Sequence, residues 1–290
     1  MLSILLPIYQ LDPFPLVKEL QQQCIALEFP FEILVFDDST DANTTIAANI
    51  NSLPHCIYHF NSKTLGRGGN RNALAQMAKG TMLLFLDGDM WPQSKNFIAH
   101  YIALSTNYPV VFGGIAYRET PPEDKHQLRW LFGRSREAYS LNQRNKNPYS
   151  TCFTSNLLIA KRILDLYPFD ATLTAYGYED LLFIKTLQQN GIPIHHIDNA
   201  AYHDGLEDSD IFLAKTAEAI RHAEKLLSIG KLEINDLRVF IWSQRLKKWG
   251  VQPFFAAILK KVAPALQKKL VGPRPKLWVL DVFKLYCLWR

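Results

Sequence analysis

The chain has few cysteines and lacks a long uncharged apolar run. Its four cysteines are scattered through 290 residues and none lies in a CxxC pair, so the sequence indicates neither a zinc site nor a disulfide framework. This cysteine usage fits a reduced, cytosolic compartment. No stretch of about 18 uncharged apolar residues occurs, so we expect no membrane span. The N-terminal segment is an apolar strand without a basic region or a cleavage site, so we expect no signal peptide.

Acidic side chains are nearly absent from the last fifty residues. Residues 241–290 carry eleven Lys and Arg side chains and one acid, Asp281, which gives this segment a net charge of +10 against +5 for the whole chain. Four of the six tryptophans lie in the same segment. Basic side chains interleaved with aromatic ones are typical of a surface that binds an anionic membrane. The alternative is a solvated basic helix pair packed on the rest of the protein; no recognised nucleic-acid-binding module accompanies the charge.

The first 110 residues alternate between apolar runs typical of strands and amphipathic runs typical of helices. Strands are predicted at 2–8, 32–36, 56–60 and 82–86, and helices at 15–27, 41–50 and 67–79. Such alternation predicts an α/β fold, a mostly parallel Rossmann-type sheet flanked by helices. The later predictions are helices at 94–105, 178–189 and 211–229, strands at 110–117 and 192–197, a mobile loop at 119–149, and a helical tail broken by Pro253, Pro264 and the turn at 272–275.

The apolar run at 82–86 leads directly into two carboxylates, Asp87 and Asp89, on either side of Gly88. Because open α/β sheets bind ligands at the carboxyl ends of their strands, these acids are candidate ligand-binding residues. Two oxygen donors at this spacing can hold one divalent cation such as Mg²⁺ or Mn²⁺. A cation there can neutralise a diphosphate and help it leave. A turn that ends a strand uses the same residue types for geometry alone, which is the structural alternative.

Two further segments have features of a nucleotide site. Asp37 and Asp38 end the strand at 32–36 and could accept hydrogen bonds from a nucleoside, although an Asx-turn and a helix cap would also explain them. The stretch from Gly66 to Asn72 begins a helix with three glycines and two arginines, and free N–H groups at a helix start favour phosphate. It matches neither a Walker A motif nor the GxGxxG fingerprint, and close packing is the alternative reason for its glycines.

Three polar side chains further along are candidates for catalysis and metal binding. Glu179 and Asp180 follow Tyr178 at a predicted helix start, where the helix dipole alone favours carboxylates. We expect Asp180 to be the catalytic base and Glu179 to contact or support an acceptor. His203 follows the short strand near residue 197 and is the predicted third metal ligand, although a lone histidine is more often structural.

With these residues in order, the chain resembles the inverting glycosyltransferases of family 2, which have the GT-A fold. The resemblance extends over about residues 1–205. It rests on seven motifs in family order: Pro7-Ile8-Tyr9, Phe36-Asp37-Asp38-Ser39-Thr40-Asp41, Arg71-Asn72-Ala73, Phe85-Leu86-Asp87-Gly88-Asp89, Ser155-Asn156, Glu179-Asp180 and His203. Residues 1–110 would form the nucleotide-sugar half of the catalytic domain and 111–205 the acceptor half. Residues 206–290 would be a helical, basic extension.

The resemblance also implies roles for individual residues. Asp180 would deprotonate the acceptor hydroxyl, and Asp87, Asp89 and His203 would hold Mn²⁺ or Mg²⁺. The acceptor would contact Glu179, Tyr178 and Asn156. The nucleotide sugar, with uridine as the usual nucleoside, would contact Pro7, Tyr9, Asp37, Asp38, Gly66, Arg71, Asp87 and Gly88. The family's usual Trp-Glu-Asp is Tyr178-Glu179-Asp180 here, and its Gly-rich stretch before the Asn is Ser155-Asn156, so the acceptor is not specified.

The predicted activity is the transfer of a sugar, with inversion, from a nucleotide-diphosphate sugar, with a UDP-sugar as the first choice, to an acceptor hydroxyl. The acceptor would be a saccharide or lipid-linked saccharide of a bacterial surface glycan. The enzyme would be cytoplasmic, with 241–290 at the inner face of the membrane and no nucleic-acid partner. One alternative is a sugar nucleotidyltransferase, for which a Gly-rich signature with Lys or Arg is expected where Pro7-Ile8-Tyr9-Gln10 stands. The other is a non-catalytic module that binds a nucleotide sugar.

Overall fold

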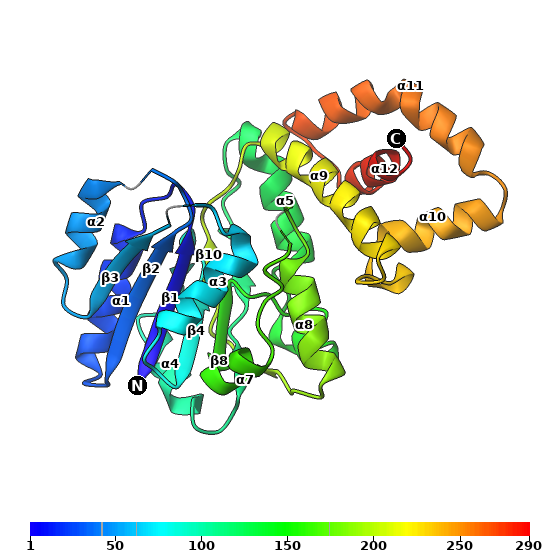
Figure 1. Cartoon of the computed structure of the whole chain (residues 1–290). Helices are drawn as coiled ribbons and strands as arrows, with labels where there is room; N and C mark the ends of the chain where they lie inside the picture. The colour runs from blue at the N-terminus through cyan, green and yellow to red at the C-terminus, as the bar shows by residue number, and fades with distance from the viewer. Residues whose placement is uncertain (42, 62, 174) are drawn as a thin grey trace. The chain divides into compact units, whose positions relative to one another are not determined.

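The computed structural model describes residues 1–41, 43–61, 63–173 and 175–290 (Figure 1). The chain divides into two compact units. The first unit comprises Met1–Tyr117, Glu137–Thr174 and Glu179–Gly205, and the second comprises Arg118–Arg136, Ala175–Tyr178 and Leu206–Arg290. The second unit therefore takes in the predicted C-terminal extension together with two short earlier segments. The division into catalytic halves at residue 110 stays a prediction.

A seven-stranded sheet forms the centre of the first unit. Its strands are β1 (Leu2–Ile8), β2 (Phe31–Asp37), β3 (Cys56–Phe60), β4 (Met82–Leu86), β6 (Val110–Phe112), β8 (Asn156–Ala160) and β9 (His195–His196). They lie in the order β3-β2-β1-β4-β8-β6-β9, and only β8 runs antiparallel to its neighbours. The sheet confirms the predicted α/β class, and β1, β3 and β4 have the predicted bounds. The apolar runs of β1 and β4 are buried, as expected for strands with both faces covered, whereas β3 at the edge of the sheet leaves Ile57 and Phe60 exposed.

Helices cover both faces of this sheet. They are α1 (Phe14–Ala26), α2 (Thr44–Asn51), α3 (Gly66–Met77), α4 (Phe97–Leu104), α6 (Leu141–Lys146), α7 (Lys161–Leu166) and α8 (Glu179–Gln189). The connections from β1 to β2 and from β2 to β3 step in one direction, whereas the connection from β3 to β4 steps back. Because such crossovers are right-handed, α3 lies on the face opposite to α1, in front of the sheet in Figure 1.

The register of the strands brings the candidate site residues to one edge. Asp37 at the end of β2 lies opposite Ile8 at the end of β1, and β4 runs parallel to β1 on its other side. The antiparallel strand β8 begins at Asn156, which lies opposite Leu86, the last residue of β4. The residues just before β8 are therefore beside the residues just after β4. This adjacency is the geometric basis of the candidate site.

A second, three-stranded sheet lies in the same unit. It consists of β5 (Met90–Pro92), β10 (Ala201–His203) and β7 (Ile115–Ala116), in the order β5-β10-β7. The strand predicted at 110–117 is therefore divided between two sheets. The division falls at Gly113 and Gly114: a Cβ on Gly113 would lie 2.4 Å from the Asn199 carbonyl oxygen, and Gly114 has φ +101°. A side chain would prevent the chain from turning here.

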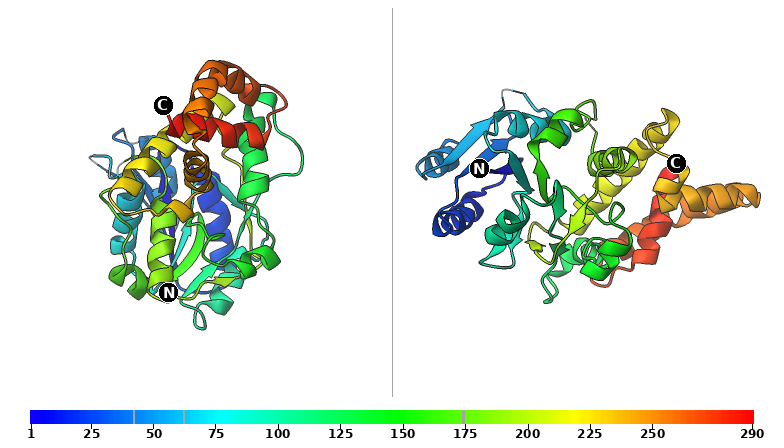
Figure 2. Two further views of the ribbon diagram at one scale, coloured as in Figure 1. Left: turned by 90° about the vertical axis from the view of Figure 1, so that its right-hand side faces the viewer. Right: turned by 90° about the horizontal axis from the view of Figure 1, so that it is seen from below.

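The second unit is helical. Its elements are η1 (Asp124–His126), α5 (Gln127–Arg136), α9 (Ser209–Ser228), η2 (Ile234–Asp236), α10 (Arg238–Lys248), α11 (Gln252–Val271) and α12 (Leu277–Leu288). Helix α12 contacts both α9 and α11, and Figure 2 shows α11 and α12 side by side. Its apolar cluster consists of Leu128, Phe212, Leu213, Ile220, Leu270, Val279, Leu280, Phe283 and Cys287.

Two predictions from the sequence are wrong. The stretch 119–149 is not a loop, because it contains α5 and α6: Leu128 of α5 is fully buried in the apolar cluster, and Ser140 with Gln143 forms a capping box at the start of α6. Pro264 does not break the tail, because α11 continues through it, whereas Pro253 lies in the first turn of α11, where proline is tolerated. No described helix is long and apolar enough to cross a membrane.

Candidate active site

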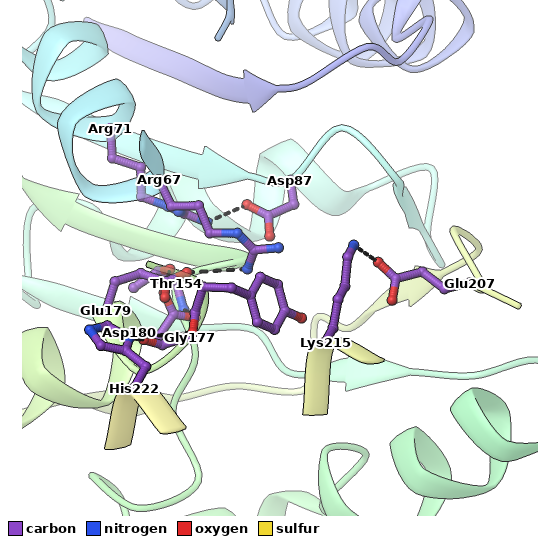
Figure 3. Close-up of polar contacts among 11 residues, drawn as sticks. Arg67, Arg71, Asp87, Thr154, Gly177, Glu179, Asp180, Glu207, Lys215 and His222 are labelled. Atoms are coloured by element: carbon purple, nitrogen blue, oxygen red, sulfur yellow. Dashed lines mark hydrogen bonds and ion pairs between the residues drawn. The ribbon is translucent and has the colours of Figure 1, made fainter. Parts of the chain in front are cut away.

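An ion pair joins the first aspartate after β4 to a helix on the sheet. Nη2 of Arg71 in α3 donates to Oδ1 of Asp87 at 2.7 Å (Figure 3). The arginine side chain is 4% exposed and that of Asp87 30%. Burial by itself lowers the pKa of Arg71, but the carboxylates of Asp87, Asp180 and Glu179 together raise it above its ordinary value. The guanidinium is therefore a permanent positive charge at the edge where the strands end.

The carboxylate of Asp87 is in a strongly charged environment. Burial raises its pKa above the ordinary value, the nearby carboxylates of Asp89 and Asp180 act in the same direction, and Arg71 opposes them. Asp87 is held in place by its own backbone, whose N–H donates to the Ser155 carbonyl oxygen at 3.1 Å. Close carboxylates repel one another, so the site as a whole favours an additional cation.

Asp180 is fixed by a residue that the sequence analysis did not identify. The hydroxyl of Thr154 donates to Oδ1 of Asp180 at 2.5 Å, and the backbone N–H of the same threonine donates to Oδ2 at 3.4 Å. Thr154 is fully buried, whereas Asp180, in the first turn of α8, is half-buried. A carboxylate held in this way has a fixed orientation and keeps some access to solvent.

The neighbouring predicted acceptor residues differ in their surroundings. Glu179 is buried and accepts a hydrogen bond from Nη1 of Arg67 at 3.2 Å, a pairing that sequence spacing does not reveal because the two residues lie on different helices. Tyr178 belongs to the second unit and has a φ of +74°, which is uncommon for a residue with a side chain. Asn156 is fully buried: Oδ1 accepts from the Tyr101 hydroxyl and Nδ2 donates to two carbonyl oxygens. This geometry favours a structural role for Asn156, and its acceptor contact stays a prediction.

The second aspartate and the histidine lie close together. Strand pairing places His203 opposite Met90, and Nε2 of His203 is 3.6 Å from Oδ2 of Asp89. The imidazole also stacks on the ring of Tyr117. Gly205 is packed against the carboxylate, since a Cβ there would lie 2.4 Å from Oδ2 of Asp89. The predicted pair is therefore brought together, with a glycine behind it that sequence spacing alone did not single out.

The carboxylate oxygens and the imidazole nitrogen at this edge are atoms that can bind a divalent cation. Among residues 1–41, 43–61, 63–173 and 175–290, no three His, Cys, Asp or Glu side chains converge as a complete metal site. Two ligands of one Mg²⁺ are about 3 Å apart, because each lies roughly 2.1 Å from the ion. The separation of 3.6 Å between Oδ2 of Asp89 and Nε2 of His203 is slightly longer than that value. Mg²⁺ commonly takes its other ligands from substrate phosphates and water.

Both predicted nucleoside acids are already bonded within the protein. Asp37 accepts hydrogen bonds from the backbone of Ser39 at 2.9 Å and from the Tyr58 hydroxyl at 2.8 Å. Asp38 accepts from the backbone N–H groups of Leu65 and Gly66 at 2.7 and 2.8 Å. The Asx-turn alternative thus holds for Asp37. Asp38 occupies the N-terminus of α3, where free N–H groups for a phosphate were expected.

The remaining predicted donor residues line the same edge of the sheet. Pro7 is half-buried near the end of β1, and Tyr9, just beyond it, is 60% exposed. Gly88 packs against Ile8, because a Cβ would lie 2.5 Å from Cγ2 of that residue. Gly66 has φ +75° at the start of α3. The structure thus brings together the ends of β1, β2 and β4 and the start of α3.

A mostly parallel sheet with acidic residues at its strand ends, and an Asp89–His203 pair beside a small second sheet, matches the GT-A fold that the resemblance implies. The sequence family described as Glycosyl transferase family 2 matches residues 3–165. The chain therefore belongs to glycosyl transferase family 2, as the resemblance predicted. No curated protein matches the chain significantly.

Solved structures share this fold. A mannosyltransferase, PcManGT from Pyrobaculum calidifontis, in complex with GDP-Man and Mn²⁺, is 14% identical with a TM-score of 0.57, and the match covers 99% of this chain and 85% of that one. Glucosyl-3-phosphoglycerate synthase from Mycobacterium tuberculosis, in complex with Mn²⁺, UDP and glucosyl-3-phosphoglycerate, is 16% identical with a TM-score of 0.51 and 79% of each chain covered.

A third similar structure is S. aureus TarS 1-349, which is 18% identical with a TM-score of 0.50, with 99% of this chain and 89% of that one covered. The match to a longer TarS structure covers only 39% of that chain. At these identities the likeness establishes the fold, and the substrates of these proteins are their own.

Proposed function

We propose that the protein transfers a sugar, with inversion, from a nucleotide-diphosphate sugar to an acceptor hydroxyl. The observation that carries the proposal is the convergence of Asp87, Arg71 and the Thr154–Asp180 pair at one edge of the sheet. A base and a diphosphate site must lie on opposite sides of one sugar for inversion in a single displacement. Membership of the family indicates glycosyl transfer as the class of reaction. The side chains at this edge of the sheet are the candidate catalytic and phosphate-binding groups.

Asp180 is the proposed catalytic base. It removes the proton of the acceptor hydroxyl while that oxygen forms a bond to the anomeric carbon and the bond from that carbon to the diphosphate breaks. Thr154 is the proposed positioning residue, because it bonds the Asp180 carboxylate through both its hydroxyl and its backbone N–H. Glu179 and Tyr178 are proposed to contact the acceptor beside the base, with Asn156 behind them.

The donor site is proposed at the ends of β1, β2 and β4. A nucleoside, with uridine as the first choice, would lie against Asp37 and Asp38, near Pro7, Tyr9 and Gly66. The diphosphate would lie at Gly88, and the charge of Arg71 would be shared between Asp87 and the phosphate oxygens. Support for a nucleotide donor comes from the family, and structures of similar fold are complexes with GDP-Man or with UDP.

A divalent cation, Mn²⁺ or Mg²⁺, is proposed to bind at Asp89, His203 and Asp87. When bound, such an ion stabilises the charge that develops on the leaving diphosphate. The protein's part is to hold the two carboxylates and the imidazole at the strand ends, and to keep Arg71 beside them as a fixed charge. Two of the similar structures contain Mn²⁺, which is consistent with this ligand set.

The acceptor is proposed to be a saccharide or a lipid-linked saccharide used in surface glycan synthesis. A cytoplasmic enzyme at the inner face of the membrane would lie next to an acceptor whose lipid is anchored in that membrane. The net charge of +10 on 241–290 supports an anionic surface as its surroundings. Neither alternative activity, nucleotidyl transfer or binding without turnover, has an observation in its favour.

The test is a donor screen. The protein is incubated with Mn²⁺, an acceptor mixture and each of a panel of UDP- and GDP-sugars, and the released nucleoside diphosphate is measured for wild type and Asp180→Asn. We expect one donor class to be turned over and the substitution to lower the rate at least about a hundredfold. Asp165→Asn, at an exposed carboxylate in α7, is the matched control and should retain the wild-type rate. An Asp180→Asn enzyme as fast as wild type would contradict the assignment of the base.

A further inference from the structure

Helix α11 has one apolar face that is packed and one that is not. Leu259, Ala263 and Leu270 are buried, and α11 contacts α12 and α9 of the same unit. The packed face is sufficient to hold α11 against α12 and α9 in the helical unit. Apolar side chains elsewhere on the helix therefore need a different explanation.

The second apolar face is exposed. Phe254, Ile258 and Val262 recur every four residues along α11, so they form one stripe on the helix surface. Phe254 is 67% exposed, Ile258 40% and Val262 39%, and Phe255 beside them is 41% exposed. Single exposed apolar residues are ordinary, but four on one helix face form a patch that indicates a binding surface.

The charged side chains of α11 itself have one sign. Helix α11 contains four lysines and no acid, and on a helical projection Lys261 and Lys268 lie at the margin of the stripe. The one acid of 241–290, Asp281, is paired with Arg136 at 2.8 Å. No carboxylate of this segment is therefore left to balance the lysines, and the surface favours an anionic partner.

Two exposed tryptophans on the neighbouring helices also combine an apolar ring with a nearby positive charge. Trp242 is 48% exposed and lies under the guanidinium of Arg245, at 5.3 Å from its ring centre. Trp278 is 58% exposed and lies under Nζ of Lys269, at 5.5 Å. An aromatic ring with a cation beside it suits the boundary between lipid headgroups and acyl chains, where one side is apolar and the other wet.

We propose that the exposed face of α11 is a docking surface for an anionic lipid bilayer, with Phe254, Ile258 and Val262 inserted among the headgroups and the lysines on lipid phosphates. A bilayer offers a uniformly negative surface, which matches fifty residues of almost one charge sign, whereas a protein partner usually presents both signs. No described helix can span the membrane, so the surface lies on the bilayer. The inference deepens the membrane setting of the proposed function and rests on it, because it names the helix face that would bind the bilayer; the binding itself requires neither donor nor acceptor.

Co-sedimentation with vesicles tests whether the apolar side chains of α11 contribute to membrane binding. The full chain is mixed with phosphatidylcholine vesicles, with or without a third of phosphatidylglycerol, in the absence of nucleotide and metal. We expect binding to the anionic vesicles only. Phe254→Ser with Ile258→Ser should weaken it at least tenfold, since both side chains lose their burial in lipid. Leu166→Ser, which removes a side chain that is 71% exposed in the first unit, is the control and should not change binding.

A variant with fewer lysines tests whether the positive charge of α11 contributes to membrane binding. Lys261→Gln with Lys268→Gln should lower the partition coefficient about fivefold for each lysine, and binding by wild type should fall as salt is raised. Lys18→Gln with Lys95→Gln, at exposed positions of the first unit, makes the same change in net charge and should bind like wild type. Circular dichroism and thermal unfolding check that the variants fold, because all the substituted side chains are exposed.

Three results would overturn the inference: no binding of wild type to anionic vesicles, equal binding of the α11 variants and wild type, or a wild-type dimer that becomes monomeric in Phe254→Ser with Ile258→Ser. The last result would make a second copy of the chain the occupant of this face. Because the assay contains no sugar nucleotide, its failure would leave glycosyl transfer untouched. An inactive protein that binds vesicles would contradict the proposed function alone.

Discussion

The buried hydroxyl of Thr154 donates a hydrogen bond to Oδ1 of Asp180 at 2.5 Å, and the backbone N–H of the same residue donates to Oδ2. Each bond reaches a different carboxylate oxygen, and together they fix the orientation of the group. Thr154 lies just before β8, next to the end of β4. The proposed base is therefore positioned by a residue of the turn that leads into the central sheet, not by its own helix.

Thr154→Val should slow catalysis without weakening donor binding. The substitution keeps the shape of the side chain but removes the hydroxyl, so the carboxylate loses one of its two fixing bonds. We expect kcat to fall about tenfold to a hundredfold, equivalent to about 1.4–2.7 kcal/mol, with the donor KM within about twofold of wild type. Thr154→Ser, which restores the hydroxyl, should recover most of the rate. Steady-state kinetics that show equal losses in both variants would point to packing as the cause.

Removal of the Arg71 charge should destabilise the first unit. Arg71→Met leaves the Asp87 carboxylate without its partner at 2.7 Å, so we expect the free energy of unfolding to fall by about 2–3 kcal/mol. Asp87→Asn added to that variant should recover part of the loss, because no unpaired charge then remains. Urea unfolding in the presence of a chelator measures both, with Arg162→Met, at an exposed position in α7, as the control. A loss below about 0.5 kcal/mol would contradict a structural role for the pair.

Stability should fall at acidic pH through His196. This side chain is buried, Nε2 donates to the Pro148 carbonyl oxygen at 2.9 Å, and Nδ1 accepts from Arg144, so the ring is neutral. Burial lowers its pKa to about 4. The unfolded chain, with a histidine pKa near 6.5, then binds more protons than the folded chain between about pH 4 and 6.5. The contribution of His196 is complete above pH 6.5 and is lost as the pH falls through this window.

The measurement is urea unfolding at pH 7 and pH 4.5 for wild type and His196→Gln. Wild type should lose about 2 kcal/mol more than the variant between these two values, since the glutamine cannot titrate. Carboxylates titrate equally in both proteins, so the difference isolates the histidine. Parallel pH profiles would show that the pKa of His196 is not lowered in the folded protein, which would contradict the prediction.

Manganese binding should depend on the Asp89–His203 pair. Replacing either residue by alanine removes one donor of a pair that is 3.6 Å apart, and we expect the affinity for Mn²⁺ in the presence of UDP to fall at least about tenfold. Electron paramagnetic resonance of free Mn²⁺ measures the affinity directly. His55→Ala, which removes an exposed imidazole, should bind like wild type. Unchanged affinity in both alanine variants would place the ion elsewhere.

The sequence predicted those features that depend on local order along the chain. The apolar run at 82–86 with its two aspartates, and the alternation before it, predicted the sheet and the edge at which the candidate site residues lie. Partners far apart in sequence could not be read in this way. Asp87 and Arg71, or Asp180 and Thr154, meet only because the order of strands brings their elements together.

Helix α5 was missed for the same physical reason. Its weak periodicity reflects a narrow apolar face, and Leu128 is buried in a cluster whose other members lie in α9, α11 and α12, about eighty to a hundred and sixty residues later. The role of Asp38 as a cap for α3 was also hidden, because a cap is normally sought beside the helix and not twenty-eight residues earlier. The local sequence therefore predicted most helices and strands, whereas the contacts between distant residues depend on how these elements pack together.

The most direct test of the central claim is phosphorus and proton NMR of a single reaction with the donor found in the screen. The account predicts that the nucleoside diphosphate appears together with a glycoside of inverted anomeric configuration, and that Asp180→Asn slows both signals equally by at least about a hundredfold. Release of pyrophosphate, retention of the anomeric configuration, or an Asp180→Asn rate equal to wild type would contradict it.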